Sequence, residues 1–115
     1  GSGIELRHPT LWRQGDVLHL FFSCTGDYPE RIYHSQCGVH DDWARWEFSR
    51  PQVILSPELI WEGADLAPTT SVMGAADSRL RELRDPGIFI EDGRAYLFYS
   101  GAGESAIGIA QLDGL

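Results

Sequence analysis

The sequence predicts an all-β protein made of about two antiparallel four-stranded sheets, and two features of its C-terminal part carry this prediction. Asp92-Gly93 lies between two apolar runs, which is a strong hairpin signal, because both central residues of the tight turn need a positive φ. The run from Tyr96 to Tyr99 is apolar at every position, whereas a strand with one wet face alternates apolar with polar residues. We therefore expect this strand to be covered on both faces.

An internal repeat extends the prediction to the whole chain. Four stretches of the first half recur in the same order in the second half: 7–12 at 84–89, 15–16 at 92–93, 19–23 at 96–100 and 32–36 at 107–111. The repeated unit is a small sheet whose two faces both need neighbours, and radial stacking of such sheets gives a β-propeller. We therefore predict two β-propeller blades, about residues 7–55 and 84–112, joined by a long connection at 56–83.

Turn residues bound the strands of the first blade, which we expect at 8–14, 17–24 and 31–38. Trp43, Trp46 and Phe48 alternate with charged residues, which predicts an outer strand with one wet face. Residues 53–55 either extend this outer strand or follow a break at Pro51.

The second blade is expected to have strands at 86–91, 94–100 and 105–112, and its fourth strand is missing. Ile4-Glu5-Leu6 could supply that strand, from the same chain or from a neighbour. Two blades cannot close a ring, and each leaves a broad apolar face bare. We therefore expect self-association into a homo-oligomer, or a portion cut from a larger propeller.

The connection at 56–83 is interrupted by prolines and glycines, so we expect no helix in it beyond one turn at 79–83. A loop this long inside a small domain tends to carry function. The Gly101-Ala102-Gly103 loop is not followed by a helix that could bind a phosphate. We expect no cofactor.

The acidic composition limits the kinds of binding partner that we expect. The chain has 115 residues, 17 acids and nine bases, with a formal net charge of −8, so nucleic acid and anionic membranes are poor candidates. No apolar stretch is long enough to span a bilayer. We expect no signal peptide and therefore a cytoplasmic protein, although the natural chain could extend further upstream. Gly1-Ser2-Gly3 resembles a cloning scar, which leaves a single domain at 4–115.

The two cysteines are expected to be free thiols. Antiparallel pairing brings Cys37 opposite residues near Leu18 rather than opposite Cys24, which is too far for a disulfide. Free thiols suit a reducing compartment.

Strand direction places four polar side chains on one rim of the sheets: His8, Asp27, Asp85 and Glu104. The long connection starts at this rim, so Glu62 and Asp65 can reach it, and Arg7 and Arg84 flank the pair closest to the central axis. Carboxylates that converge on a pocket with apolar walls are the arrangement that acid/base chemistry needs.

Three stretches resemble a known family: 61–66 (WEGADL), 83–86 (LRDP) and 96–105 (YLFYSGAGES). They are similar to the C-terminal part of five-bladed-propeller proteins related to glycoside hydrolase families 43 and 32, in particular to their bacterial glycosyl hydrolase-like relatives. The resemblance covers nearly the whole chain but only about two of the five blades. It implies a carbohydrate-active protein in which rim carboxylates bind or hydrolyse a glycan.

By this resemblance, Glu62 would be the general acid and Asp85 one of the catalytic aspartates. Six residues would contact the substrate: His8, Arg7, Arg84, Asp65, Glu104 and Trp61. The chain departs from the pattern, because His8 stands where the first repeat would carry its aspartate, and no Asp-Pro precedes Glu62. A complete catalytic trio would need further blades or a second copy.

Simpler roles compete with these assignments. Asp85 could close an Asx turn before Pro86, Glu62 could be a solvated side chain, and Glu104 could pair with an arginine across the rim. A cation site at His8, Asp85 and Glu62 lacks the tight His or Cys spacing of a metal site. The alternative function is a non-catalytic propeller module that self-assembles and keeps a vestigial pocket.

Overall fold

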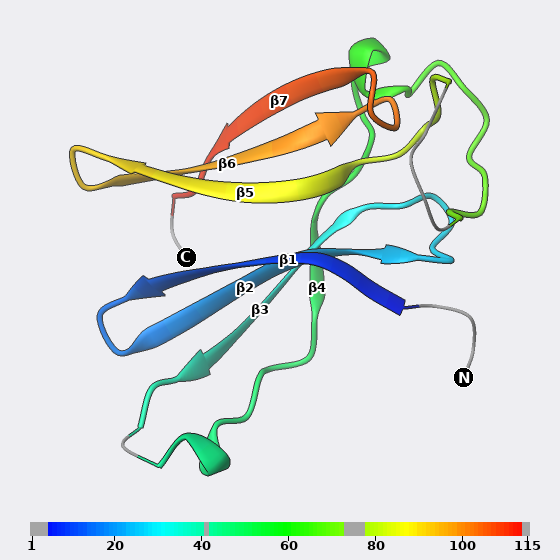
Figure 1. The fold of residues 1–115 in the computed structure, drawn as a ribbon. Coiled ribbons are helices and arrows are strands. Elements are labelled where there is room, and N and C mark those ends of the chain that lie inside the picture. The colour runs from blue at the N-terminus through cyan, green and yellow to red at the C-terminus, as the bar shows by residue number, and fades with distance from the viewer. Residues whose placement is uncertain (1–4, 41, 73–77, 114–115) are drawn as a thin grey trace.

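The computed structural model describes residues 5–40, 42–72 and 78–113 and shows an all-β fold of seven strands (Figure 1). The strands are β1 (Glu5–Gln14), β2 (Val17–Thr25), β3 (Ile32–Gly38), β4 (Gln52–Leu55), β5 (Arg84–Glu91), β6 (Arg94–Gly101) and β7 (Ala106–Gln111). Two short 3₁₀ helices are η1 (Trp43–Arg45) and η2 (Ile60–Glu62). Gly1-Ser2-Gly3, the expected cloning scar, lies outside the described residues.

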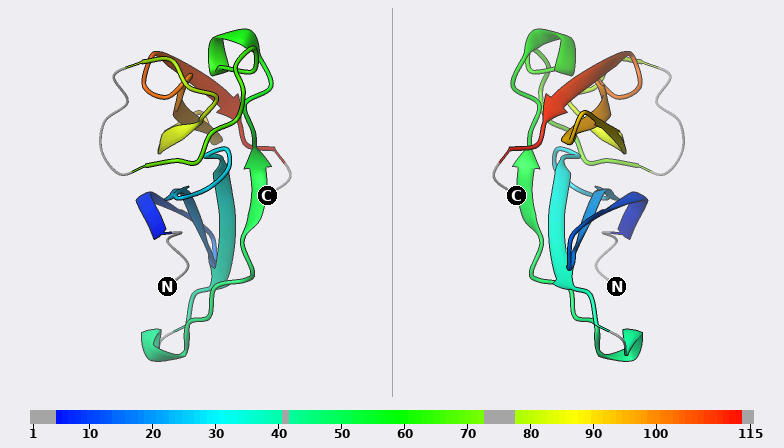
Figure 2. Two further views of the ribbon diagram at one scale, coloured as in Figure 1. Left: turned by 90° about the vertical axis from the view of Figure 1, so that its right-hand side faces the viewer. Right: turned by 90° about the vertical axis from the view of Figure 1, so that its left-hand side faces the viewer.

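The strands form two antiparallel sheets, β1-β2-β3-β4 and β5-β6-β7. The sheets stack face to face, with β5 against β1 and β2, while η1 lies at the end of the first sheet remote from the second (Figures 1 and 2). The three hairpin-linked strands expected in each repeat are present. No helix of the described residues is long and apolar enough to cross a membrane.

Local geometry agrees with the sequence signals at the turns and in the register. Asp92 and Gly93 both have positive φ, 50° and 73°, as the tight turn between β5 and β6 requires. Leu18 pairs with Cys37 across β2 and β3, and Cys24 and Cys37 are buried free thiols.

The core lies between the two sheets. Phe21 and Ile32 project from the first sheet, Leu97 and Tyr99 from the second, and Leu83 from the connection fills the space between them. Along β6 the buried residues alternate with half-buried ones. Among the described residues, the expected cover is complete on the inner face of this strand, whereas the outer face is only partly shielded.

One strand prediction is wrong, and one of two open alternatives is confirmed. Trp43 to Phe48 is not an outer strand, because the Asp42 carboxylate accepts a hydrogen bond from the Ala44 amide (3.1 Å) and caps η1 instead. The outer strand is β4, which follows the break at Pro51 and pairs with β3.

Within the same chain, Glu5 and Leu6 do not complete the second sheet. Ile4 lies outside the described residues, and Glu5 and Leu6 extend β1, where they pair with Thr25 and Cys24. Within the described residues the second sheet therefore has three strands, where a four-stranded blade was expected. At 79–83, where the sequence allowed one helical turn at most, the described residues form none; the connection instead contains the single 3₁₀ turn η2.

Candidate functional site

Matched β-bulges interrupt the first strand of each sheet. The ladder register shifts after Arg7 in β1 and after Arg84 in β5. Each bulge contains a residue that precedes proline: His8 has a φ of 51° and Asp85 a φ of 53°. Positive φ is unfavourable for residues that carry a Cβ, and a following proline restricts the backbone further. The repeat therefore builds the same strained backbone twice, and such strain concentrates at functional sites.

The two strained residues face each other, because β1 lies against β5. His8 Nε2 is 3.2 Å from Asp85 Oδ1, and their side chains are 55% and 34% exposed. The second carboxylate oxygen of Asp85, Oδ2, accepts a hydrogen bond of 3.1 Å from Ser100 Oγ. The imidazole and the carboxylate thus reach solvent while strand positions and hydrogen bonds fix their orientation.

A buried ion-pair cluster adjoins this pair. Arg7 Nε donates to Glu30 Oε2 at 2.8 Å, and Arg7 Nη2 pairs with the other oxygen of the same carboxylate. Arg84 Nε lies 3.2 Å from Glu30 Oε1, and Arg84 Nη2 donates to Glu82 Oε1 at 2.5 Å. Ser71 Oγ also donates to Glu30, at 2.5 Å. One carboxylate, that of Glu30, therefore joins arginines from both sheets.

Full burial makes this cluster a rigid support. Arg84, Glu30 and Glu82 are almost completely buried, and a buried charge is tolerated only with a close partner and further hydrogen bonds. The hydrogen bond to Glu30 raises the pKa of Arg7, and the charges of Glu82 and Asp85 raise it further. The guanidinium groups of Arg7 and Arg84, expected to contact substrate, thus lie among buried carboxylates next to the rim.

Glu104 lies at the edge of the cluster. Its Oε1 is 3.9 Å from Arg84 Nη1, and its side chain is about one third exposed. Glu104 therefore extends the charged cluster from the buried arginine towards solvent.

Glu62 is deeply buried and anchors the long connection. Its Oε2 accepts a hydrogen bond from the Tyr99 hydroxyl at 2.6 Å, and its Oε1 accepts two from the amides of Glu58 and Leu59, each at 3.0 Å. Burial, and then the hydrogen bond and charge of Glu62, raise the pKa of Tyr99. Three donors therefore hold the carboxylate of the expected general acid.

Trp61 packs beside this anchor. Its ring stacks on Tyr99 with centroids 6.1 Å apart and is partly exposed. A Cβ built on Gly108 of β7 would lie 2.5 Å from both Trp61 Cη2 and Tyr99 Cζ. The glycine therefore makes room for the two stacked rings, which dock η2 onto the inner face of the second sheet.

The structure separates the two expected catalytic carboxylates. Glu62 binds Tyr99, whereas Asp85 binds Ser100, and the side chains of successive strand residues point to opposite faces of a sheet. Asp65 lies elsewhere, in an exposed ion pair with Arg79 at 2.8 Å that lowers the pKa of Asp65. His8 and Asp85 are the pair that the structure brings together.

Asp27, also expected on this rim, is bound within its own loop. Its carboxylate accepts hydrogen bonds from Arg31 and from the Tyr33 hydroxyl, the latter at 2.8 Å. Burial and this hydrogen bond raise the pKa of Tyr33 to about 12.

Sequence reasoning missed three residues of the cluster: Glu30, Ser71 and Glu82. Glu82 was detectable, because it stands two positions before Arg84 at the start of an expected inner strand. Glu30 and Ser71 come from loops, and only the fold brings them to the arginines.

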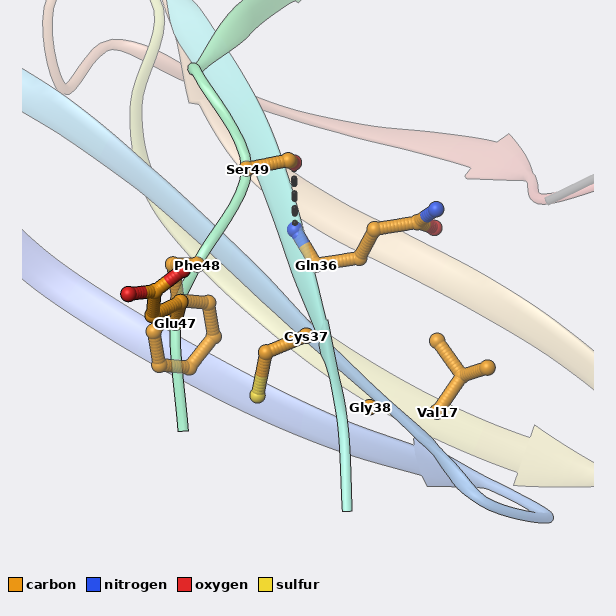
Figure 3. A pocket seen from close by; sticks show the side chains of 7 residues that line it. All are labelled: Val17, Gln36, Cys37, Gly38, Glu47, Phe48 and Ser49. Atoms are coloured by element: carbon orange, nitrogen blue, oxygen red, sulfur yellow. Dashed lines mark hydrogen bonds between the residues drawn. The ribbon is translucent and has the colours of Figure 1, made fainter. Parts of the chain in front are cut away.

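A surface pocket of about 310 Å³ lies away from this rim, between β3 and the segment before β4. Its walls include Val17 and Gly38, which pair at the Gly15-Asp16 end of the first sheet, opposite the His8 end. Figure 3 shows Cys37 extending towards Phe48, and the backbone N–H of Gln36 donating a hydrogen bond to Ser49 Oγ. None of the expected site residues lines this pocket.

The rim carboxylates and imidazoles do not form a metal site within residues 5–40, 42–72 and 78–113. Among them, no group of three or more His, Cys, Asp or Glu side chains is placed to hold a metal ion. His8 and Asp85 therefore stand as a pair.

Comparisons with known proteins add one relative. No model of a known protein family matches the chain, and no solved structure matches it. The chain is similar to the uncharacterized protein R118 of Acanthamoeba polyphaga mimivirus, with 40% identity over 108 residues. The alignment covers 93% of the chain and 30% of R118, so the chain spans less than a third of that relative's length.

Proposed function

We propose that this chain is a two-blade portion of a carbohydrate-active β-propeller, and that the rim around His8 and Asp85 contacts the glycan. The observation that carries the proposal is the facing pair of strained, partly exposed residues, 3.2 Å apart, on the two matched bulges. Backbone strain persists only where the surrounding structure enforces it, and here a buried ion cluster adjoins both bulges.

The chemistry of the pair suits a polyol. A carboxylate accepts hydrogen bonds from sugar hydroxyls, and an imidazole nitrogen can donate or accept. Ser100 binds one oxygen of Asp85 and His8 lies beside the other, and the carboxylate still reaches solvent, with its side chain 34% exposed. Preorganised groups of this kind fix the orientation of a small ligand and supply specificity.

We propose binding as the role of this chain by itself, and hydrolysis only for a larger assembly. A glycosidase needs an acid and a second carboxylate on either side of the scissile bond. Glu62 already accepts hydrogen bonds from three donors. Its partner Tyr99 and the Asp85 partner Ser100 are successive residues of β6, so they point to opposite faces of the sheet. A catalytic partner for Asp85 would come from outside the chain.

Affinity measurements with arabinofuranosyl and fructofuranosyl oligosaccharides test the proposal. Asp85→Asn and His8→Asn are suitable variants because asparagine tolerates positive φ. We expect each to weaken binding at least tenfold. The control is Arg79→Met, which removes the exposed ion pair with Asp65 and should bind like the wild type. Binding that is unaffected by both rim substitutions would refute the site, and release of an aryl leaving group that requires Asp85 would favour hydrolysis.

A non-catalytic, self-assembling module is the second candidate function. The observation that favours it is the apolar outer face of the second sheet, where Phe89, Ile107 and Ile109 are exposed. Such a surface is typical of a protein–protein contact. The two functions are compatible, since the exposed apolar residues of that face are not the residues that form the His8–Asp85 pair.

A further inference from the structure

The internal repeat gives the outer face of the second sheet a buried counterpart in the first sheet. Five residues of the first sheet and their repeat equivalents make the comparison: Trp12 and Phe89, His19 and Tyr96, Phe21 and Phe98, Ile32 and Ile107, His34 and Ile109. Cross-strand pairing puts Phe21 and His34 on one face, and Phe98 and Ile109 on one face in the same way. The two sets therefore occupy the same positions on two copies of one sheet.

The two sets differ sharply in exposure. Phe21 and Ile32 are fully buried against the second sheet, whereas Ile107 is 78% exposed and Ile109 59% exposed. An exposed apolar cluster of aromatic and branched residues on a sheet face marks an interaction surface. We call the set Phe89, Tyr96, Phe98, Ile107 and Ile109 the donor face.

The surface that would receive the donor face is also present in the chain. In the core, the first sheet packs against Ile88, Leu97 and Tyr99 of the second sheet. Their repeat equivalents are Leu11, Leu20 and Phe22, which lie on the outer face of the first sheet because they alternate with its inward residues. Leu11 is 56% exposed and Leu20 half-buried, whereas Phe22 stacks on Tyr33 and is only 5% exposed, so Leu11 offers most of the free apolar surface. We call this set the acceptor face.

We infer that the donor face docks on the acceptor face of a second copy of this chain, and that this contact repeats the packing already present between its two sheets. The argument for a second copy is that the chain carries both halves of the contact and uses each half once internally. A contact between two different faces is head-to-tail, so it generates a ring if the rotation closes and a filament if it does not.

The same docking bears on the rim. Within the chain, packing of the two sheets brings β1 beside β5 and His8 beside Asp85. Repetition of that packing would bring β5 of one copy beside β1 of the next. Asp85 would then lie between two His8 side chains, one from its own chain and one from the second copy. The inference rests on the second candidate function, self-assembly, and specifies its geometry; it stands independently of the proposed carbohydrate site.

Sedimentation velocity over a wide concentration range tests this inference. We expect the wild type to sediment as a dimer or larger species, and Ile109→Glu and Leu11→Glu each to shift it to the monomer. Val72→Glu is the matched control, since Val72 is equally exposed but lies in the connection; it should associate like the wild type. Ile107→Glu is a second donor-face variant, and thermal denaturation checks that every variant is folded.

Mixing the two single variants distinguishes this geometry from any other. Ile109→Glu keeps an intact acceptor face and Leu11→Glu an intact donor face, so an equimolar mixture should form a heterodimer that grows no further. A folded wild type that stays monomeric throughout would overturn the inference, as would a mixture that stays monomeric. Donor-face or acceptor-face variants that still self-associate would also overturn it.

Discussion

The Tyr99 hydroxyl donates a 2.6 Å hydrogen bond to the buried carboxylate of Glu62, and this contact fixes the long connection to the centre of the second sheet. Tyr99 belongs to the core between the two sheets, while Glu62 ends η2 and binds the two amides that precede it. The motif around Glu62 is therefore part of the folding architecture, whatever ligand the rim contacts.

Replacement of Glu62 by glutamine should destabilise the fold. A glutamine has one acceptor oxygen and one donor nitrogen, so at least one of the three donors would lose its acceptor. An unsatisfied buried group costs about 1–3 kcal/mol. Chemical denaturation of Glu62→Gln should show a loss of this size. Glu58→Gln, at an exposed neighbour, should change the unfolding free energy by less than about 0.5 kcal/mol; equal effects would contradict the anchor role.

A methyl group at Gly108 should disrupt the stacked rings of Trp61 and Tyr99. The added Cβ would come within 2.5 Å of atoms of both rings, and overpacking of this kind costs about 1–3 kcal/mol. Gly87→Ala is the matched control in the same sheet, because no atom lies within 4 Å of its added Cβ. We expect Gly108→Ala to lower the melting temperature and Gly87→Ala to leave it nearly unchanged.

Two serines at equivalent repeat positions should respond differently to removal of the hydroxyl. Ser100 Oγ donates to Asp85, whereas the buried Ser23 Oγ has no hydrogen-bond partner among the described residues. The two hydroxyls differ because the carboxylate of Asp85, which accepts from Ser100, is replaced in the first repeat by the imidazole of His8. Ser100→Ala should cost about 0.5–1.5 kcal/mol, and Ser23→Ala should be neutral or stabilising. A larger loss for Ser23→Ala, measured by denaturation, would contradict this assignment.

A buried histidine pair should make the fold sensitive to acid. His19 Nδ1 lies 2.7 Å from His34 Nε2, and His19 Nε2 lies 3.1 Å from Gln14 Oε1. Burial lowers the pKa of both imidazoles, and the charge of His19 lowers that of His34 further. The unfolded chain therefore binds protons at a higher pH than the folded chain does. Stability from this pair is present above the unfolded pKa, near 6.5, and is lost as the pH falls through the folded values.

Denaturation midpoints at pH 7.5 and at pH 5 check the histidine prediction. The wild type should lose stability at the lower pH, and His34→Gln should reduce this dependence. His40→Gln, at an exposed position, should keep it. Equal pH dependence in all three proteins would show that the buried pair does not control the response.

The repeat made the sheets predictable, because local signals and the duplicated pattern agree. Asp92-Gly93 encodes its turn through positive φ, and the Leu18–Cys37 register follows from hairpin length. The alternation of apolar and charged residues from Trp43 to Phe48 wrongly predicted a strand, because the Asp42 side chain caps a helical turn there and competes with strand pairing. Alternation could not reveal that the described residues shield one face of β6 only partly.

The candidate site was predictable only in part. His8 and Asp85 could be brought together from strand direction alone, since both begin the inner strands of the two repeats. The buried partners of Arg7 and Arg84 depend on how the loops at Glu30 and Ser71 fold back, and no periodic pattern encodes that. The burial of Glu62 likewise arises from its contact with Tyr99, 37 positions away in the sequence.

Direct observation of the His8 side chain during oligosaccharide titration tests the central claim, that the facing bulges form a glycan-binding rim. Heteronuclear NMR of the imidazole groups separates exposed His8 from buried His19 and His34. The account predicts saturable shifts of the His8 ring signals that disappear in Asp85→Asn, with the signals of His19 and His34 unchanged. Absence of any His8 shift, or the same shift in Asp85→Asn, would contradict it.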